Sequence, residues 1–345
     1  MSKIISMTQM GWQSFFQQQM TLEEWELMIP ARIIEQHKSY FELFYQQGTC
    51  RLPVKSNLPP LVVGDWILID QDFQFVRLLE RKSCFYRKAA GTQVATQLIS
   101  SNVDTAFIVC SMNEDFNLNR IERFLALVNE SGAMPVIVLT KVDCCEDPDA
   151  IITQVSALSS SLCIESVNCL DSSSVQKLNA WIQAGSTLAV IGSSGVGKST
   201  LINTLSQQNE QQTGEIRVND SKGKHTTTRR SLVPLGDSGV ILDTPGMREI
   251  QLADCKAGIS KTFSDIEKLA EQCRFSDCQH QSEPGCSVLQ AIQTNQLESR
   301  RLKSYLKLKR EEQLNSSNLA EKRAKDKSLT RMYKSIQSKK HQQKF

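Results

Sequence analysis

One stretch constrains this chain more than any other: Gly192-Ser193-Ser194-Gly195-Val196-Gly197-Lys198-Ser199-Thr200. It follows an apolar run, 188–191, and leads into Leu201-Ile202-Asn203-Thr204-Leu205. This order of strand, glycine-rich loop and helix predicts a phosphate-binding P-loop. Glycines let the backbone N–H groups turn toward phosphate oxygens, so the loop and the helix N-terminus attract anions. Lys198 is expected to bridge the β- and γ-phosphates, and Ser199 to bind Mg²⁺ through its hydroxyl. The stretch predicts a nucleotide site.

The composition limits the class of protein. A chain of 345 residues with 40% hydrophobic and 22% charged residues is typical of a globular protein with two or three domains. No apolar run approaches the roughly 18 residues of a membrane span, and the N-terminus lacks a signal-peptide core. Eleven cysteines, an odd number and mostly scattered, favour a reducing compartment over a disulfide framework. We therefore expect a cytoplasmic protein without membrane contact, and a monomer.

Short β-type runs fill the segment after an N-terminal lead of residues 1–30. The lead contains a predicted capping box, Thr21 to Glu24, that opens a small helix. Five strands are expected, separated by turn residues: 33–34, 40–45, 50–54, 61–69 and 73–79. Such a series suits a small barrel of the OB-fold type, which serves either to bind RNA or only to pack on the next domain. The basic, aromatic stretch 81–88, interpreted as a linker, favours nucleic acid.

Strands and helices alternate from Thr92 to Gly246. A buried strand over 104–110, a helix over 119–130 and a second buried strand over 135–139 predict a parallel sheet that binds ligands at the carboxyl ends of its strands. The second strand ends at Thr140-Lys141-Val142-Asp143. Asp143 is expected to accept hydrogen bonds from the guanine N1–H and amino group, which adenine cannot supply, and the Lys141 stem to lie along the base. Thr140 replaces the usual asparagine and keeps one hydroxyl for contacts with the P-loop.

A third motif, Asp243-Thr244-Pro245-Gly246, ends the apolar strand 239–243. Asp243 is expected near the Mg²⁺ shell, and the Gly246 N–H is expected to sense the γ-phosphate. Between this motif and the P-loop lies a basic stretch with three threonines, of which we favour Thr227 as a second Mg²⁺ ligand.

The order of these motifs is unusual, because the guanine motif precedes the P-loop. Circular permutation explains this order, since neighbouring strands keep their places while the chain ends move. The segment after Gly246 then leads directly into the C-terminal domain.

That domain contains a predicted zinc site, Cys273, Cys278, His280 and Cys286. Three thiolates and one imidazole within fourteen residues complete a tetrahedral set, which leaves no open position for water and indicates a structural Zn²⁺. A basic helix is expected over 296–313. A basic tail follows, and beside a nucleotide-binding core it favours an anionic partner such as RNA.

Taken together, these motifs resemble the circularly permuted, small-ribosomal-subunit-dependent GTPases of the RsgA (YjeQ) family. Further motifs carry the resemblance over about residues 31–310: Arg87-Lys88-Ala89-Ala90-Gly91, Asn102-Val103-Asp104, His225-Thr226-Thr227 and Met247-Arg248. The resemblance implies an OB-fold domain (31–92), a permuted α/β P-loop GTPase domain (93–250), a mainly helical zinc domain (251–310) and a basic tail (311–345). It also implies GTP hydrolysis stimulated by the 30S subunit, GDP as product, 16S rRNA as a partner and a role in late 30S maturation.

The sequence departs from the family pattern in several places. Asn168-Cys169 stands where a Ser-Ala pair usually lies behind the base, and the N-terminal lead and basic extension are less typical. Met247 stands where many GTPases carry a water-orienting glutamine, so slow intrinsic hydrolysis is expected, with His225 or an rRNA group as the positioning group. Two alternatives stay open: an RNA-binding module that binds GTP with little turnover, and a P-loop ATPase or kinase, against which Asp143 argues.

Overall fold

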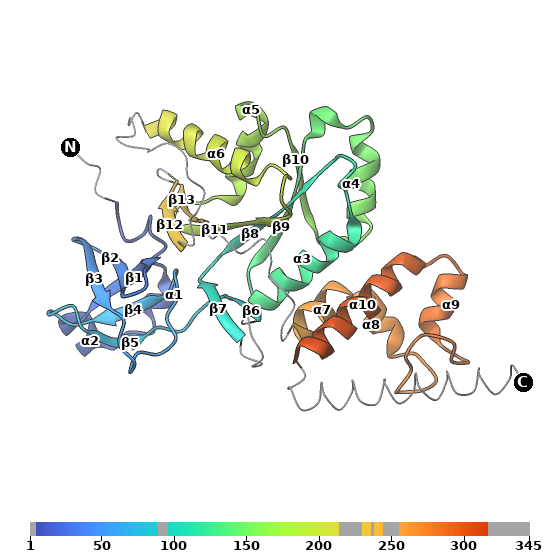
Figure 1. Ribbon diagram of the computed structural model, residues 1–345, viewed down its shortest axis with the longest axis horizontal. Coiled ribbons are helices and arrows are strands. Elements are labelled where there is room, and N and C mark those ends of the chain that lie inside the picture. Colours follow the sequence, from blue (N-terminus) through green and yellow to red (C-terminus); the bar gives the residue numbers. More distant parts are fainter. Residues whose placement is uncertain (1–4, 89–95, 214–229, 236–237, 244–254, 317–345) are drawn as a thin grey trace, which may run out of the picture.

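The computed structural model describes residues 5–88, 96–213, 230–235, 238–243 and 255–316. Figure 1 shows a β-rich N-terminal part, a central sheet with helices on both faces and a C-terminal group of helices. Nine strands form one continuous path, β10-β9-β8-β11-β13-β12-β1-β2-β3, and β4 and β5 branch from β1. The N-terminal strands thus extend the central sheet.

The N-terminal part is a strongly bent antiparallel sheet of five strands: β1 Ile29–Gln36, β2 Tyr40–Tyr45, β3 Gly48–Pro53, β4 Trp66–Ile69 and β5 Phe75–Leu78. The first half of β1 pairs with β4 and its second half pairs with β2, with an irregularity between Ile33 and Glu35. Because β1 changes partner along its length, the sheet curls around a core that includes Ile33, Leu43 and Ile67. Five strands are confirmed, but β1 is longer than the predicted 33–34 and β4 occupies only the second half of the predicted 61–69.

Two short helices of the N-terminal lead pack on this sheet, α1 Ser14–Gln17 and α2 Leu22–Leu27. The predicted capping box is confirmed: Thr21 accepts from the Glu24 N–H, and Glu24 accepts from the Thr21 N–H. Trp12 and Phe16 join Trp66 in a separate apolar cluster, which explains why all four residues of β4 are buried. One face of β4 fills the sheet's own core and the other is covered by the lead.

The linker interpretation of residues 81–88 is wrong for 84–88. Cys84–Lys88 forms β6, which pairs antiparallel with β7, Thr96–Ser101. Phe85 and Ile99 are buried in the main apolar cluster. This stretch is therefore part of the packed structure.

The central sheet is parallel apart from one strand, as its alternating pattern predicts. Its strands are β8 Thr105–Ser111, β9 Met134–Thr140, β10 Cys163–Val167, β11 Ser186–Gly192, β12 Arg230–Pro234 and β13 Gly239–Asp243. β12 is antiparallel both to β13 and to β1. Alternate residues of β8 enter different apolar clusters: Ile108 faces α3 and Phe107 faces α6.

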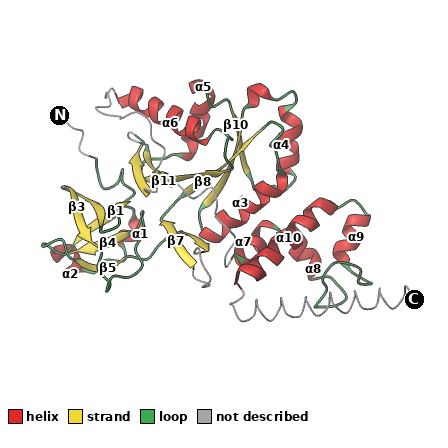
Figure 2. Cartoon of the chain, viewed as in Figure 1, coloured by secondary structure: helices red, strands yellow, loops and turns green. Residues whose placement is uncertain are grey.

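Helices cover both faces of this sheet (Figures 1 and 2). They are α3 Leu118–Ser131, α4 Pro148–Ser156, α5 Ser172–Val175 and α6 Lys198–Thr213, with 3₁₀ turns at Val142–Cys144 and Gln176–Trp181. The C-terminal helices are α7 Lys256–Thr262, α8 Ser264–Ala270, α9 Ser287–Gln293 and α10 Ser299–Ser316. α7 packs closely on α3 because residue 258 is a glycine, whose Cβ would lie 2.1 Å from the Ala126 carbonyl oxygen. Among the described residues, none of these helices has the length and apolar character needed to span a bilayer.

Candidate nucleotide site and metal centre

The P-loop sequence lies between β11 and α6, as predicted. β11 ends at Gly192 and α6 begins at Lys198. Gly192 has φ +150°, and a Cβ there would lie 2.3 Å from the Val109 carbonyl oxygen, so the strand end tolerates only glycine. Ser194 and Gly195 are exposed at the tip of the loop, and Val196 is buried beneath it. The loop is thus anchored at its base and open to solvent at its tip.

Lys198 lies across this loop. Its ammonium group donates to the carbonyl oxygen of Gly192 at 2.8 Å and also to that of Ser193. Ser199 is exposed in the first turn of α6, and Thr200 is half-buried beside it. A cation over the loop and an exposed hydroxyl at the helix N-terminus are the groups that a nucleoside polyphosphate with Mg²⁺ requires.

The structure brings the Thr140–Asp143 motif to the same edge of the sheet. Thr140 ends β9 and is fully buried, and its hydroxyl donates to the Val196 carbonyl oxygen at 2.6 Å. Lys141 follows in a left-handed conformation with φ +59° and opens a 3₁₀ turn through half-buried Val142. Asp143 is exposed, with one carboxylate oxygen 3.6 Å from the Cys144 sulfur. The threonine in place of asparagine therefore keeps a direct contact with the P-loop.

The loop after β10 completes this edge. Its internal hydrogen bonds occupy the N–H groups of Asn168, Leu170 and Asp171. The Cys169 carbonyl oxygen accepts from Thr204 of α6 at 2.7 Å. No described group accepts a hydrogen bond from the Cys169 N–H. Burial raises the pKa of the Cys169 thiol to about 11, so this side chain is neutral at physiological pH. The loop thus presents one unused backbone donor beside the P-loop.

Several predicted site residues cannot be placed. His225, Thr227 and Gly246 lie outside the described residues, as does Met247. Asp243 is the last residue of β13, next to β11 in the sheet, and only its backbone is described. The Thr204–Cys169 bond was missed by sequence reasoning, because no motif connects a helix threonine to a distant loop carbonyl.

The predicted metal ligands Cys273, Cys278, His280 and Cys286 are brought together, with all four ligand atoms within 4.8 Å of one another. The sulfurs of Cys273 and Cys286 are 3.8 Å apart, and the His280 Nδ1 is 3.4 Å from the Cys286 sulfur. A tetrahedron with Zn–S bonds of about 2.3 Å has sulfur–sulfur edges of about 3.8 Å. The donor set therefore fits a four-coordinate zinc ion.

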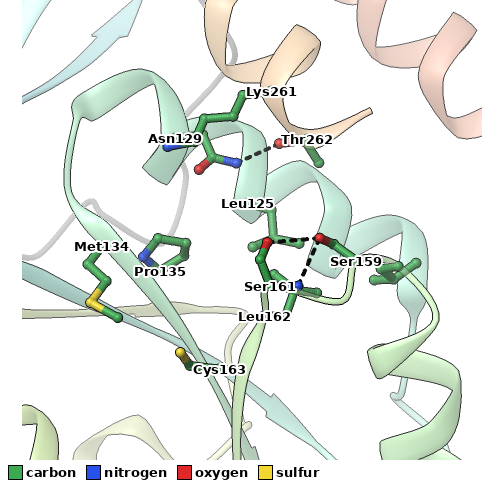
Figure 3. Close-up of a pocket in the computed structure, with 11 residues that line it drawn as sticks. Leu125, Asn129, Met134, Pro135, Ser159, Ser161, Leu162, Cys163, Lys261 and Thr262 are labelled. Atoms are coloured by element: carbon green, nitrogen blue, oxygen red, sulfur yellow. Dashed lines mark hydrogen bonds between the residues drawn. The ribbon is translucent and has the colours of Figure 1, made fainter. Parts of the chain in front are cut away.

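A pocket of about 190 Å³ lies between α3, α7, the start of β9 and the loop that leads into β10. Figure 3 shows the residues that line it. Asn129 donates to the Thr262 hydroxyl there at 2.9 Å. Met134 and Pro135 line the pocket at the start of β9, whereas Thr140 lies at the other end of that strand. The pocket belongs to the packing of the C-terminal helices and is separate from the nucleotide edge.

A family model described as RsgA GTPase matches residues 78–253, a range that includes both nucleotide motifs. The chain belongs to the RsgA GTPase family. It is a GTPase, and the resemblance inferred from the motifs is confirmed.

Other RsgA proteins are similar over nearly the whole chain. Small ribosomal subunit biogenesis GTPase RsgA 2 of Vibrio parahaemolyticus is 54% identical over 330 residues, which cover 96% of this chain and 92% of the relative. Small ribosomal subunit biogenesis GTPase RsgA of Mesorhizobium japonicum is 44% identical over 317 residues, covering 90% of this chain and 91% of the relative.

Two solved structures share the fold. YjeQ from Thermotoga maritima aligns with a TM-score of 0.61 at 22% identity, covering 82% of this chain and 97% of that one. YloQ, a circularly permuted GTPase, aligns with a TM-score of 0.58 at 23% identity, covering 86% of this chain and 96% of that one. The permuted order deduced for this RsgA protein is thus the order of a known fold.

Proposed function

We propose that this GTPase acts in late maturation of the 30S ribosomal subunit in the cytoplasm, as a monomer whose GTP state is coupled to rRNA binding. The observation that carries the proposal is the 54% identity, over 96% of the chain, to a protein named a small ribosomal subunit biogenesis GTPase. The contact between Thr140 and Val196 supports a single nucleotide site built from two distant motifs.

In this proposal, residues 192–200 hold the phosphates of GTP, and Lys198 places its charge between the β- and γ-phosphates. When bound, Mg²⁺ neutralises phosphate charge that develops during hydrolysis. Ser199 and Thr227 would hold it, with Asp243 in its outer shell. Gly246 would sense the γ-phosphate through its N–H.

Guanine recognition is assigned to two segments, the Thr140–Asp143 motif and the loop that contains Cys169. Asp143 accepts hydrogen bonds from the base, Lys141 packs along it, and Thr140 fixes their position relative to the P-loop through the Val196 carbonyl. The unused Cys169 N–H is suited to donate to the guanine O6 oxygen. This donor belongs to the backbone, so it is retained although Cys169 replaces the usual alanine. On this basis the departure at Asn168-Cys169 preserves specificity for GTP.

RNA binding is assigned to the N-terminal sheet, which we interpret as an OB-fold. His37 stacks on Tyr40 with ring centroids 4.1 Å apart, and the Arg51 guanidinium lies 4.7 Å from the centroid of the Tyr40 ring. Aromatic rings are suited to stack on the bases of single-stranded RNA, and cations beside them are suited to neutralise its phosphates. The zinc ion is assigned a structural role at Cys273, Cys278, His280 and Cys286, consistent with its complete ligand set.

The test is phosphate release from GTP with and without purified 30S subunits. We expect slow release from the protein alone, strong stimulation by 30S subunits, and no stimulated release from Lys198→Ala. Binding of GTP without stimulated turnover would favour an RNA-binding module with little hydrolysis. His225→Ala would then test the positioning of water: unchanged stimulated turnover would exclude His225 from that role.

A further inference from the structure

The helix α2 exposes three large apolar side chains. Leu22, Trp25 and Leu27 are 86%, 46% and 51% exposed, all within six residues. Scattered exposed apolar residues are normal, but a group of this kind on one short helix marks an interaction site. We call these three residues the α2 patch.

The helix that carries the α2 patch is fixed to the N-terminal sheet by several contacts. Glu24 forms a two-pronged ion pair with Arg77 of β5, at 2.6 and 2.8 Å. The Gln71 side chain donates to the Leu27 carbonyl oxygen, and Trp25 packs edge-on against Trp12. Because the capping box and these contacts fix the helix in the free protein, little conformational entropy of α2 is lost when a partner binds.

Acidic residues share the helix with the patch. Glu23 and Glu26 are exposed on α2, and Glu24 lies beside them in its ion pair with Arg77. Residues 4–31 contain three glutamates and no lysine or arginine. Acidic charge repels RNA phosphates and anionic lipids, and two copies of this patch would also repel each other. A basic protein surface with apolar side chains is complementary to it.

We propose that the α2 patch docks a basic protein segment carried by the small-subunit particle. This inference rests on the proposed function, because the particle supplies the partner. In this proposal the protein engages the particle through two chemically different surfaces, with rRNA at the part of the N-terminal sheet that carries Tyr40 and Arg51 and a basic protein at α2. Leu22, Trp25 and Leu27 supply the apolar anchors, and Glu23 and Glu26 select for positive charge.

The test compares three full-length variants in binding to purified 30S subunits. Leu22→Ser/Leu27→Ser and Glu23→Lys/Glu26→Lys are each expected to weaken binding by roughly tenfold. Leu314→Ser serves as the control, since Leu314 is 48% exposed on α10, far from the patch in sequence. Intrinsic GTP hydrolysis is expected to be unchanged in all three. Equal 30S affinity of the wild type and both patch variants would overturn the inference.

A photo-reactive amino acid at position 22 identifies the occupant. We expect a 30S-dependent adduct that protease removes and nuclease does not. An adduct to RNA, an adduct to a second copy of the chain, or no adduct despite bound 30S would each overturn the inference and leave the proposed function intact. Failure of the wild type to bind 30S subunits would overturn both.

Discussion

The N-terminal sheet and the C-terminal helices are attached to the GTPase region by different kinds of contact. At the N-terminal sheet, β1 pairs with β12 through backbone hydrogen bonds, and Arg32 of β1 is almost completely buried. Arg32 donates to the Thr187 hydroxyl at 2.8 Å and to carbonyl oxygens that include Met10 and Asn102. Burial lowers the pKa of Arg32 to about 10, so it remains charged at neutral pH. The hydrogen-bond acceptors of this cation are neutral, and the carboxylates of Asp104 and Asp65 lie close enough to offset part of the lowering of its pKa.

On the C-terminal side, charged groups meet directly. Glu122 of α3 is fully buried and accepts from Arg301 at 2.9 Å and from Arg300 at 3.0 Å. Arg301 also contacts Asp265 of α8 at 2.6 Å, and Arg123 pairs with Glu311 of α10 at 2.6 Å. The helices α3, α8 and α10 are thus joined by ion pairs.

This difference in contacts indicates which attachment is more strongly destabilised when one of the two interacting side chains is removed. Losing one partner of a buried ion pair strands a charge, whereas losing a donor to neutral acceptors leaves only unpaired polar groups. β12 follows in sequence the segment that contains Thr227, and α7 follows the segment that contains Gly246. β12 and α7 therefore each follow directly after a segment with a predicted nucleotide contact. We expect the C-terminal attachment to lose more stability than the N-terminal one when a single side chain is removed.

The largest effect is expected from removal of the zinc ion that we propose at Cys273, Cys278, His280 and Cys286. Stripping the metal with a chelator, or replacing Cys278 by serine, should unfold the segment around residues 273–286, because structural zinc contributes folding free energy on the order of 10 kcal/mol. Hydrogen exchange should rise across α8 and α9 while β1 and β12 stay protected. Cys144→Ser, at an exposed cysteine outside the ligand set, is the control. Loss of protection in β1 and β12 as well would contradict independent attachments.

The next largest effect is expected at Glu122. Glu122→Ala leaves Arg301, only 6% exposed, without its buried carboxylate and should lower the free energy of unfolding by about 3–5 kcal/mol. The double variant Glu122→Ala/Arg301→Met should recover part of this loss, because it removes the stranded charge. Urea unfolding of the two single variants and the double variant measures this coupling, and additive losses would refute it.

These attachments were beyond the reach of sequence reasoning, whereas the nucleotide motifs were not. The P-loop and the Thr140–Asp143 motif are short runs whose residue types are fixed by local chemistry, and their strands follow from apolar runs. The β1–β12 pairing joins distant segments, and Arg32 in a strand gives no sign of its acceptors. Gly258 likewise resembles any helix glycine until α3 lies against it. The 84–88 stretch was misjudged because its basic residues concealed the buried Phe85.

A smaller effect is expected at the N-terminal sheet. Arg32→Met removes a buried cation together with its desolvation cost, and it leaves the Thr187 hydroxyl and several carbonyls unpaired. We expect a loss of about 2 kcal/mol in the free energy of unfolding. Arg51→Met, at an exposed arginine of β3 in the same sheet, should change stability little. If Arg32→Met lowered the free energy of unfolding as much as Glu122→Ala, hydrogen bonds to neutral acceptors and buried ion pairs would not differ in the way proposed.

The smallest effect is expected from the ion pair that fixes α2 to β5 of the N-terminal sheet. The hydrogen bond from Arg77, followed by that from the Thr21 backbone, lowers the pKa of Glu24 from 4.5 to about 2. Because the folded pKa is depressed, this pair stabilises the protein above pH 4.5, and its contribution is lost as the pH falls from 4.5 toward 2. At neutral pH Glu24→Gln should cost about 0.5–1 kcal/mol, since the pair is partly exposed.

Urea midpoints of the wild type and Glu24→Gln should therefore converge as the pH falls through this range. Glu23→Gln, at the exposed neighbour, should show no such convergence. A gap between wild type and Glu24→Gln that stays constant on acidification would mean that Arg77 does not hold the carboxylate in its charged form. Added salt should narrow the gap at neutral pH, because an exposed pair is screened. The buried Glu122–Arg301 pair should respond far less to salt, which separates the two ionic contacts by a measurement that requires no further mutation.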